Sequence, residues 1–132
     1  MCWSNYMVTP IVLKKPLRVY KVGTVSIFGD FISLYRDFRY YESEVMPTVE
    51  IDPEFDRFHP AARLLDPVWC YSYFHIHEGY HSYLTEERAK FSKDEMNEIG
   101  IFEIPAGATI YVNYKLKEVV STDIKYLEKL EL

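Results

Sequence analysis

Cysteine and glycine are scarce in this sequence, and their scarcity excludes several kinds of protein. The two cysteines, Cys2 and Cys70, are too few for the disulfide framework of a small secreted domain. The five glycines are isolated from one another, which excludes the glycine-rich loops that bind phosphates or dinucleotides. We therefore expect a protein of a reducing compartment with no bound cofactor.

Long apolar runs and an excess of basic residues are also missing. No stretch approaches the roughly 18 apolar residues that a membrane-spanning helix needs. Residues 1–15 lack the charged and apolar regions of a signal peptide. The 15 lysines and arginines against 20 acidic residues give a net charge of −5, which argues against non-specific binding to nucleic acids or anionic membranes. We expect a cytoplasmic protein that binds neither.

Aromatic residues are abundant instead, with 12 tyrosines, 8 phenylalanines and 2 tryptophans in 132 residues. A chain of this length can bury a substantial core, so we expect a single domain over residues 1–132. Aromatic side chains favour strands, and tyrosines are also enriched where proteins contact one another. The composition therefore predicts a β-rich protein with a tyrosine-rich surface through which it forms a homodimer or binds a protein partner.

The order of apolar and polar residues predicts an α+β fold. Thr85 followed by two glutamates predicts the start of a short helix that ends near Phe91. Alternating residues and turn signals predict strands over 17–23, 24–35 with a hairpin turn at Gly29-Asp30, 36–45, 68–77, 101–105 and 109–115, with shorter elements near Val49, at 61–65 and at 92–100. The tail 119–132 fits a helix or a strand. We expect a mostly antiparallel, twisted sheet or partly open barrel of six to eight strands with one or two short helices.

Three histidines lie close together in FHIHEGYHSYLT, residues 74–85. If 68–77 is a strand, His75 and His77 share one face and could bind a metal ion together with His81. This spacing resembles that of cupins, which carry His-x-His and then a Pro-x-Gly motif, although Ile110 stands where their further histidine should be. The alternative is that these histidines are polar members of a half-exposed aromatic face, with His81 in a turn.

A second candidate site lies just before the expected helix. Gly79 allows a tight turn after the strand, and His81 and Ser82 then lie near the helix start. Backbone N–H groups at a helix start can bind a phosphate or carboxylate. The sequence therefore offers His81 and Ser82 as ligand-binding residues, with a purely structural role as the alternative.

Most of the chain resembles a family of small uncharacterised proteins found in gut Bacteroidales and their phages. The segments that carry the resemblance are PLRVYKVG (16–23), EGYHSYLTEERAK (78–90), FEIPAGATIYVN (102–113) and VVSTDIKYL (119–127). The resemblance implies an architecture and a relation to phages, and it supplies no mechanism. We expect a small protein-interaction or regulatory module.

The layout is also similar to that of ADP-ribosyltransferase-like folds, which bind NAD. Arg18, Ser82, Thr85 and either Glu128 or Glu131 occupy corresponding places, and this analogy makes Arg18 a ligand-binding candidate. The Ser-Thr-Ser motif of such folds is replaced by HSYLT, and their Glu-x-Glu motif is missing from the tail. An interaction module, an ADP-ribosyltransferase-like domain and a cupin-like metal protein therefore remain as hypotheses, and the sequence leaves open whether the protein is an enzyme.

Overall fold

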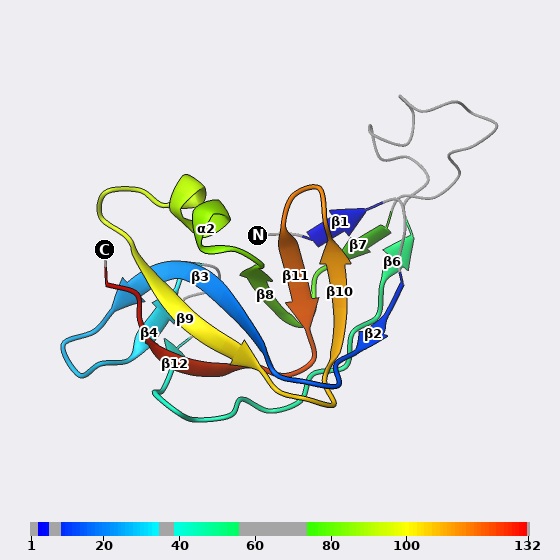
Figure 1. The fold of residues 1–132 in the computed structure, drawn as a ribbon, viewed down its shortest axis with the longest axis horizontal. Helices are drawn as coiled ribbons and strands as arrows, with labels where there is room; N and C mark the ends of the chain where they lie inside the picture. The colour runs from blue at the N-terminus through cyan, green and yellow to red at the C-terminus, as the bar shows by residue number, and fades with distance from the viewer. Residues whose placement is uncertain (1–2, 6–8, 35–38, 56–73, 132) are drawn as a thin grey trace.

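The computed structural model describes residues 3–5, 9–34, 39–55 and 74–131. Within these residues the chain forms 12 strands and one short helix, and every strand pair is antiparallel. The main sheet is twisted and does not close on itself (Figure 1). The predicted α+β fold with a mostly antiparallel, partly open sheet is confirmed, with more strands than expected.

The main sheet has nine strands, and its path runs in the order β12-β9-β3-β8-β11-β10-β2, with β4 paired to β3 and β5 paired to β4. A smaller sheet has the order β1-β7-β6. The strands are β1 (Trp3–Asn5), β2 (Ile11–Val12), β3 (Leu17–Val25), β4 (Phe31–Ser33), β5 (Arg39–Tyr40), β6 (Glu54–Phe55), β7 (Phe74–Ile76), β8 (Tyr80–Tyr83), β9 (Glu98–Ile104), β10 (Thr109–Asn113), β11 (Glu118–Ser121) and β12 (Lys125–Lys129).

Strand β3 organises the sheet, because it pairs with β9, β4 and β8. Its pairing with β9 runs without a break from Leu17 opposite Ile104 to Gly23 opposite Glu98. Side chains alternate along a strand, and here Val19 and Lys21 are both on the buried face. The alternation therefore carries a lysine toward the interior of the protein.

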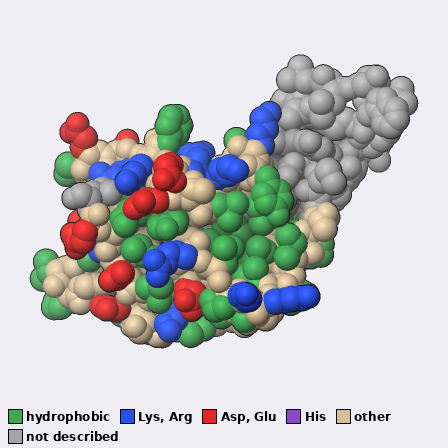
Figure 2. Space-filling model, viewed as in Figure 1, with side chains coloured by type: hydrophobic (Ala, Val, Ile, Leu, Met, Phe, Trp, Pro, Cys, Tyr) green, Lys and Arg blue, Asp and Glu red, His purple; other side chains and the backbone are tan. Residues whose placement is uncertain are grey.

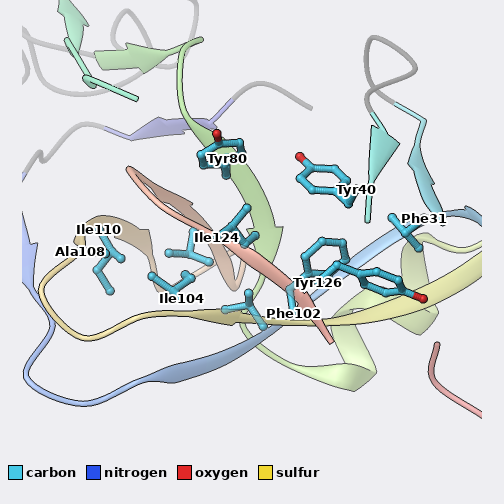
Figure 3. Close-up of a cluster of buried hydrophobic side chains, with 11 residues drawn as sticks. Phe31, Tyr40, Tyr80, Phe102, Ile104, Ala108, Ile110, Ile124 and Tyr126 are labelled. Atoms are coloured by element: carbon cyan, nitrogen blue, oxygen red, sulfur yellow. The ribbon is translucent and has the colours of Figure 1, made fainter. Parts of the chain in front are cut away.

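The main core is a group of aromatic rings on that same face (Figure 3). Phe102 from β9 lies 5.1 Å from Phe31, 5.1 Å from Tyr40 and 5.0 Å from Tyr126, measured between ring centroids. The rings of Phe31 and Tyr40 are each nearly perpendicular to the ring of Phe102. This edge-to-face arrangement is a favourable aromatic geometry. Isoleucine and valine side chains from β3, β9, β10 and β11 extend this core.

A smaller core lies on the opposite face of β11 and joins it to the small sheet. Val119 belongs to the main core, whereas its neighbour Val120 packs with Ile76 and Tyr111. Ile51 packs against this second group. The alternation along β11 therefore ties both sheets together.

Several expected elements are confirmed. The hairpin turn predicted at Gly29-Asp30 joins β3 to β4, with Gly29 at φ 91° and the N–H of Ser26 donating to the carbonyl of Asp30 at 2.8 Å. The strands at 101–105 and 109–115 are present as β9 and β10. The tail forms strand β12 and not a helix.

Other expected elements are wrong. Residues 92–100 do not form a helical turn that ends at Gly100, because Gly100 lies within β9 beneath the rings of Phe31 and Phe102. Val49 is not in a strand, although its N–H donates to the carbonyl of Thr122 at 2.8 Å. Of the strand expected at 36–45, residues 39–45 are described, and only Arg39–Tyr40 (β5) form a strand there. The turn expected at 61–65 lies outside the described residues.

The helix α2 (Glu86–Ser92) begins as predicted, with Thr85 as its N-cap and two glutamates in its first turn. The Thr85 hydroxyl accepts from the N–H of Arg88 at 3.2 Å. Within the described residues, no helix is long and apolar enough to cross a membrane.

Thr85→Ala should lower the free energy of unfolding by about 1 kcal/mol, because an N–H at the helix start loses its acceptor. Thr85→Ser keeps an acceptor oxygen and should change stability by only a few tenths of a kcal/mol. Urea unfolding of both variants measures the difference. Equal losses in the two variants would show that the cap contributes nothing.

Candidate functional site

A cavity of about 370 Å³ opens where β3, β4, β5 and β8 come together. The residues that line it include Lys21, Tyr40, Tyr80 and Ser82. The chain turn before β8 forms part of its rim. A cavity of this size is at the lower end of the range for small-molecule sites.

Lys21 is the most unusual residue of this wall, since it is only 8% exposed. Its Nζ donates to the backbone carbonyl of His81 and lies 5.3 Å from the ring centroid of Tyr40. No carboxylate of the described residues forms an ion pair with it. Burial lowers the pKa of the Lys21 amine from 10.5 to about 7. A large fraction of this amine is therefore uncharged at neutral pH.

Ser82 lies beside Lys21 on the neighbouring strand. Tyr20 of β3 pairs with Tyr83 of β8 in antiparallel register, so the next positions, Lys21 and Ser82, face the same side. The side chain of Ser82 is fully enclosed at 1% exposure, and its Oγ has no hydrogen-bond partner in the part of the chain that the structure describes. A buried hydroxyl without a partner destabilises a fold by roughly 1–3 kcal/mol.

Ser82→Ala should therefore raise the free energy of unfolding by about 1 kcal/mol. Ser121 provides the matched control, because its side chain is equally buried and its hydroxyl donates to the carbonyl of Asp123 at 2.9 Å. Ser121→Ala should lower stability by about 1 kcal/mol. Chemical denaturation gives both values. A loss of stability in Ser82→Ala equal to that in Ser121→Ala would mean that the Ser82 hydroxyl has a stabilising partner.

Two tyrosines belong to the apolar part of the wall, together with Val22, Leu34 and Val49. The rings of Tyr40 and Tyr80 are 6.4 Å apart and meet edge to face. The Tyr80 hydroxyl donates to the carbonyl of Pro47 at 2.5 Å, which fixes the ring in place. Burial raises the pKa of both phenols. Both therefore stay protonated at neutral pH and contribute no charge to the cavity.

The sequence predicted that His81 and Ser82 lie near the start of the helix. They lie instead inside strand β8. Gly79, at φ 102°, lies in the bend between β7 of the small sheet and β8, which pairs with β11 and β3 of the main sheet. The Nε2 of His81 is 3.1 Å from the carbonyl oxygen of His77. Burial lowers the pKa of His81 to about 4, so its ring is neutral at pH 7.

The other two histidines share a face, as predicted from their spacing. The rings of His75 and His77 are stacked with centroids 6.1 Å apart, and Ile76 between them is buried on the opposite side. His77 Nε2 lies 3.7 Å from a carboxylate oxygen of Glu54. Among residues 3–5, 9–34, 39–55 and 74–131, no group of three or more His, Cys, Asp or Glu could hold a metal ion. His75, His77 and His81 therefore do not form the predicted metal-binding group.

The remaining candidates lie apart from the cavity. Arg18 is exposed on β3 and faces away from Lys21, since the two differ by an odd number of positions. Thr85 caps the helix. Glu128 and Glu131 are exposed near the end of the chain. Cys70 and most of the predicted strand 68–77 lie outside the described residues.

Sequence reasoning missed Lys21, the residue on which the site depends. The available signal was its position in LRVYKVG, because Lys21 shares a face with Val19 and Leu17. A lysine at an apolar position of an alternating pattern indicates either an exposed edge or a buried amine. Only the partners across the sheet distinguish the two.

No protein-family model, no curated protein and no solved structure matches this chain. The resemblance to small Bacteroidales and phage proteins therefore stays a prediction. The function has to be inferred from the cavity itself.

Proposed function

We propose that this protein is a small regulatory domain that binds an uncharged organic molecule in the cavity beside Lys21. The observation that carries the proposal is the buried hydroxyl of Ser82, a residue of the cavity lining, which has no partner among the described residues. Lys21 lies beside it without a carboxylate partner in the same part of the chain. A ligand oxygen would satisfy the hydroxyl, and the ligand's apolar body would lie against the tyrosine rings.

The electrostatics of the wall favour an uncharged ligand. His81 is neutral and the two phenols are protonated at pH 7. Burial disfavours the charged form of Lys21. An anion would need this charged amine as its partner, so its binding would carry the cost of protonating a buried lysine. A cation would lie close to this amine and to no buried carboxylate of the lining. A neutral alcohol or carbonyl compound avoids both penalties.

Three six-membered-ring probes test this proposal by NMR titration of the backbone amides. Cyclohexanol should shift the resonances of Lys21, Tyr80 and Ser82, whereas cyclohexanecarboxylate and cyclohexylammonium should shift them less at equal concentration. Ser82→Ala should weaken cyclohexanol binding about 3-fold to 10-fold, the effect of one net hydrogen bond. Thr24→Ala, on the exposed face of β3, should leave the affinity unchanged. Tighter binding of a charged probe, or shifts elsewhere, would contradict the proposal.

A protein partner or a second copy of the chain is the other candidate, as the aromatic composition predicted. It is supported by Ile27 and Phe28, which are 94% and 81% exposed at the tip of the β3–β4 hairpin. Figure 2 also shows hydrophobic side chains gathered over β10, β11 and β2. In this case the protein would act as an interaction module in the cytoplasm of a bacterium or a phage-infected cell.

Light scattering after size exclusion tests this second candidate. The wild-type chain should elute as a dimer, and the double variant Ile27→Ser, Phe28→Ser should elute as a monomer. A dissociation constant near 100 µM corresponds to roughly 5 kcal/mol of binding free energy. A wild-type chain that stays monomeric at this concentration or above would argue against self-association through these residues.

A further inference from the structure

The cavity places an amine and a hydroxyl side by side against an apolar wall. Among the described residues, Lys21 Nζ has one hydrogen-bond acceptor, the carbonyl of His81, and two aromatic rings near it, Tyr40 at 5.3 Å and Phe102 at 5.9 Å. The Ser82 hydroxyl faces the same side from the next strand. Lys21 is therefore a residue of the cavity lining as well as a residue of the protein interior.

A structural lysine rarely has these surroundings. Lysines at the edge of a core usually extend their ammonium group into water, and buried lysines are usually paired with a carboxylate. Lys21 does neither within the described residues. A desolvated lysine in an apolar pocket is one of the ways in which proteins prepare an amine as a nucleophile.

We propose that Lys21 captures a small aldehyde or ketone as an imine, with the Ser82 hydroxyl hydrogen-bonded to the carbonyl oxygen. This inference rests on the proposed function, because the carbonyl compound has to occupy the same cavity. It adds that the bound molecule carries a carbonyl group and is held by a reversible covalent bond to Nζ.

The reaction needs no co-reactant beyond the amine and the carbonyl compound. The nitrogen lone pair attacks the carbonyl carbon and forms the C–N bond, while the carbonyl π electrons move to the oxygen, where Ser82 stabilises the developing charge. The nitrogen then loses its proton and the oxygen gains one, giving a carbinolamine. Loss of the second N–H proton and departure of the protonated oxygen as water leave the C=N bond. Nothing is oxidised or reduced. Burial supplies the uncharged amine, because it lowers the pKa of Lys21 to about 7.

Reductive trapping with cyclohexanone tests the inference. Sodium cyanoborohydride reduces an imine to a stable secondary amine, so intact mass should increase by one cyclohexyl group and peptide mapping should place it on Lys21. Lys21→Met should abolish this modification, whereas Lys115→Met, at an exposed position, should leave it unchanged. Excess cyclohexanol should occupy the cavity and reduce the modification of Lys21 in the wild-type chain. This competition tests the site even if the Lys21 variant does not fold.

The outcomes separate the two proposals. Modification spread evenly over exposed lysines, or unaffected by cyclohexanol and by Lys21→Met, would overturn the imine. If cyclohexanol shifts the cavity resonances and cyclohexanone leaves no adduct on Lys21, the imine is wrong and the non-covalent site stands. If neither compound reaches the cavity, both proposals are wrong.

Discussion

Replacing Lys21 with methionine should raise the free energy of unfolding by roughly 1–4 kcal/mol at pH 6, the range found when buried ion pairs are exchanged for apolar side chains. The folded pKa of Lys21 is about 7, against 10.5 for a solvated lysine. A difference of this size corresponds to about 5 kcal/mol of penalty on the charged amine. Methionine forgoes the hydrogen bond to the His81 carbonyl, which reduces the net gain. Urea denaturation of both proteins measures the difference.

The same lysine makes stability depend on pH. Between pH 7 and 10.5 the unfolded chain binds a proton at Lys21 that the folded chain has released, so the free energy of unfolding rises with pH over this interval. His81 acts in the same direction at lower pH, because its folded pKa is about 4 against 6.5 when solvated. Lys21→Met should remove the rise above pH 7 and keep the rise between pH 4 and 6.5.

Tyrosines limit the rise at high pH. Burial raises the pKa of Tyr40 and Tyr80, and raises that of Tyr126 to about 12. Above their solvated pKa of 10.0 the unfolded chain loses protons that the folded chain retains, so stability falls. Glu118, whose pKa is raised by burial, opposes His81 in acid. Maximum stability should lie between about pH 9 and pH 10, above the usual range of pH 5–8.

Lys115→Met is the control for this series, since Lys115 is exposed. It should change stability by less than about 0.5 kcal/mol at every pH. A wild-type maximum near neutrality, shared by the Lys21 variant, would show that the buried amine does not govern the pH dependence.

Gly23→Ala should destabilise the protein by about 3 kcal/mol, at the upper end of the range for overpacked sites. A Cβ atom at Gly23 would lie 2.2 Å from the carbonyl oxygen of Ile32 and 2.7 Å from the ring of Phe31. The backbone oxygen belongs to the paired strand β4 and cannot turn away. Because Phe31 packs on Phe102 and Tyr126, the displacement would spread through the aromatic core.

Gly107→Ala is the matched control for Gly23→Ala. A Cβ atom there meets nothing within 4 Å, although φ is +91°. The loss should therefore reflect backbone strain alone, about 1–2 kcal/mol. Thermal and urea unfolding of both variants test the comparison. Equal losses would mean that β3 and β4 separate easily and that the packing at Gly23 is not tight.

The sequence predicted those elements whose signals are local. Gly29-Asp30 marked a hairpin, and Thr85 with two glutamates marked a helix, and both are present. The strand β8 was missed. It occupies only the few residues between Gly79 and the helix cap Thr85, so it has little room for an alternating pattern, and its partners in β3 and β11 are distant in sequence. Gly100 was taken for the end of a turn, and only the rings that cover it explain its place in a strand.

The candidate site was predicted less well than the fold, for a similar reason. Ser82 and His81 were selected as residues near a helix start, and they do line a cavity, but from a buried strand. Lys21 was taken for an ordinary strand residue. Its burial comes from Tyr40, Phe102 and the chain of β8. Desolvation of this kind is a property of the assembled sheet and leaves no local pattern.

The protonation of Lys21 in the folded protein tests the account most directly. A pH titration of its side-chain Cε resonance by carbon-detected NMR should give a midpoint near 7, well below that of the exposed lysines. A midpoint close to 10.5 would mean that water or a counter-charge reaches the amine, and the binding site built around it would then be wrong.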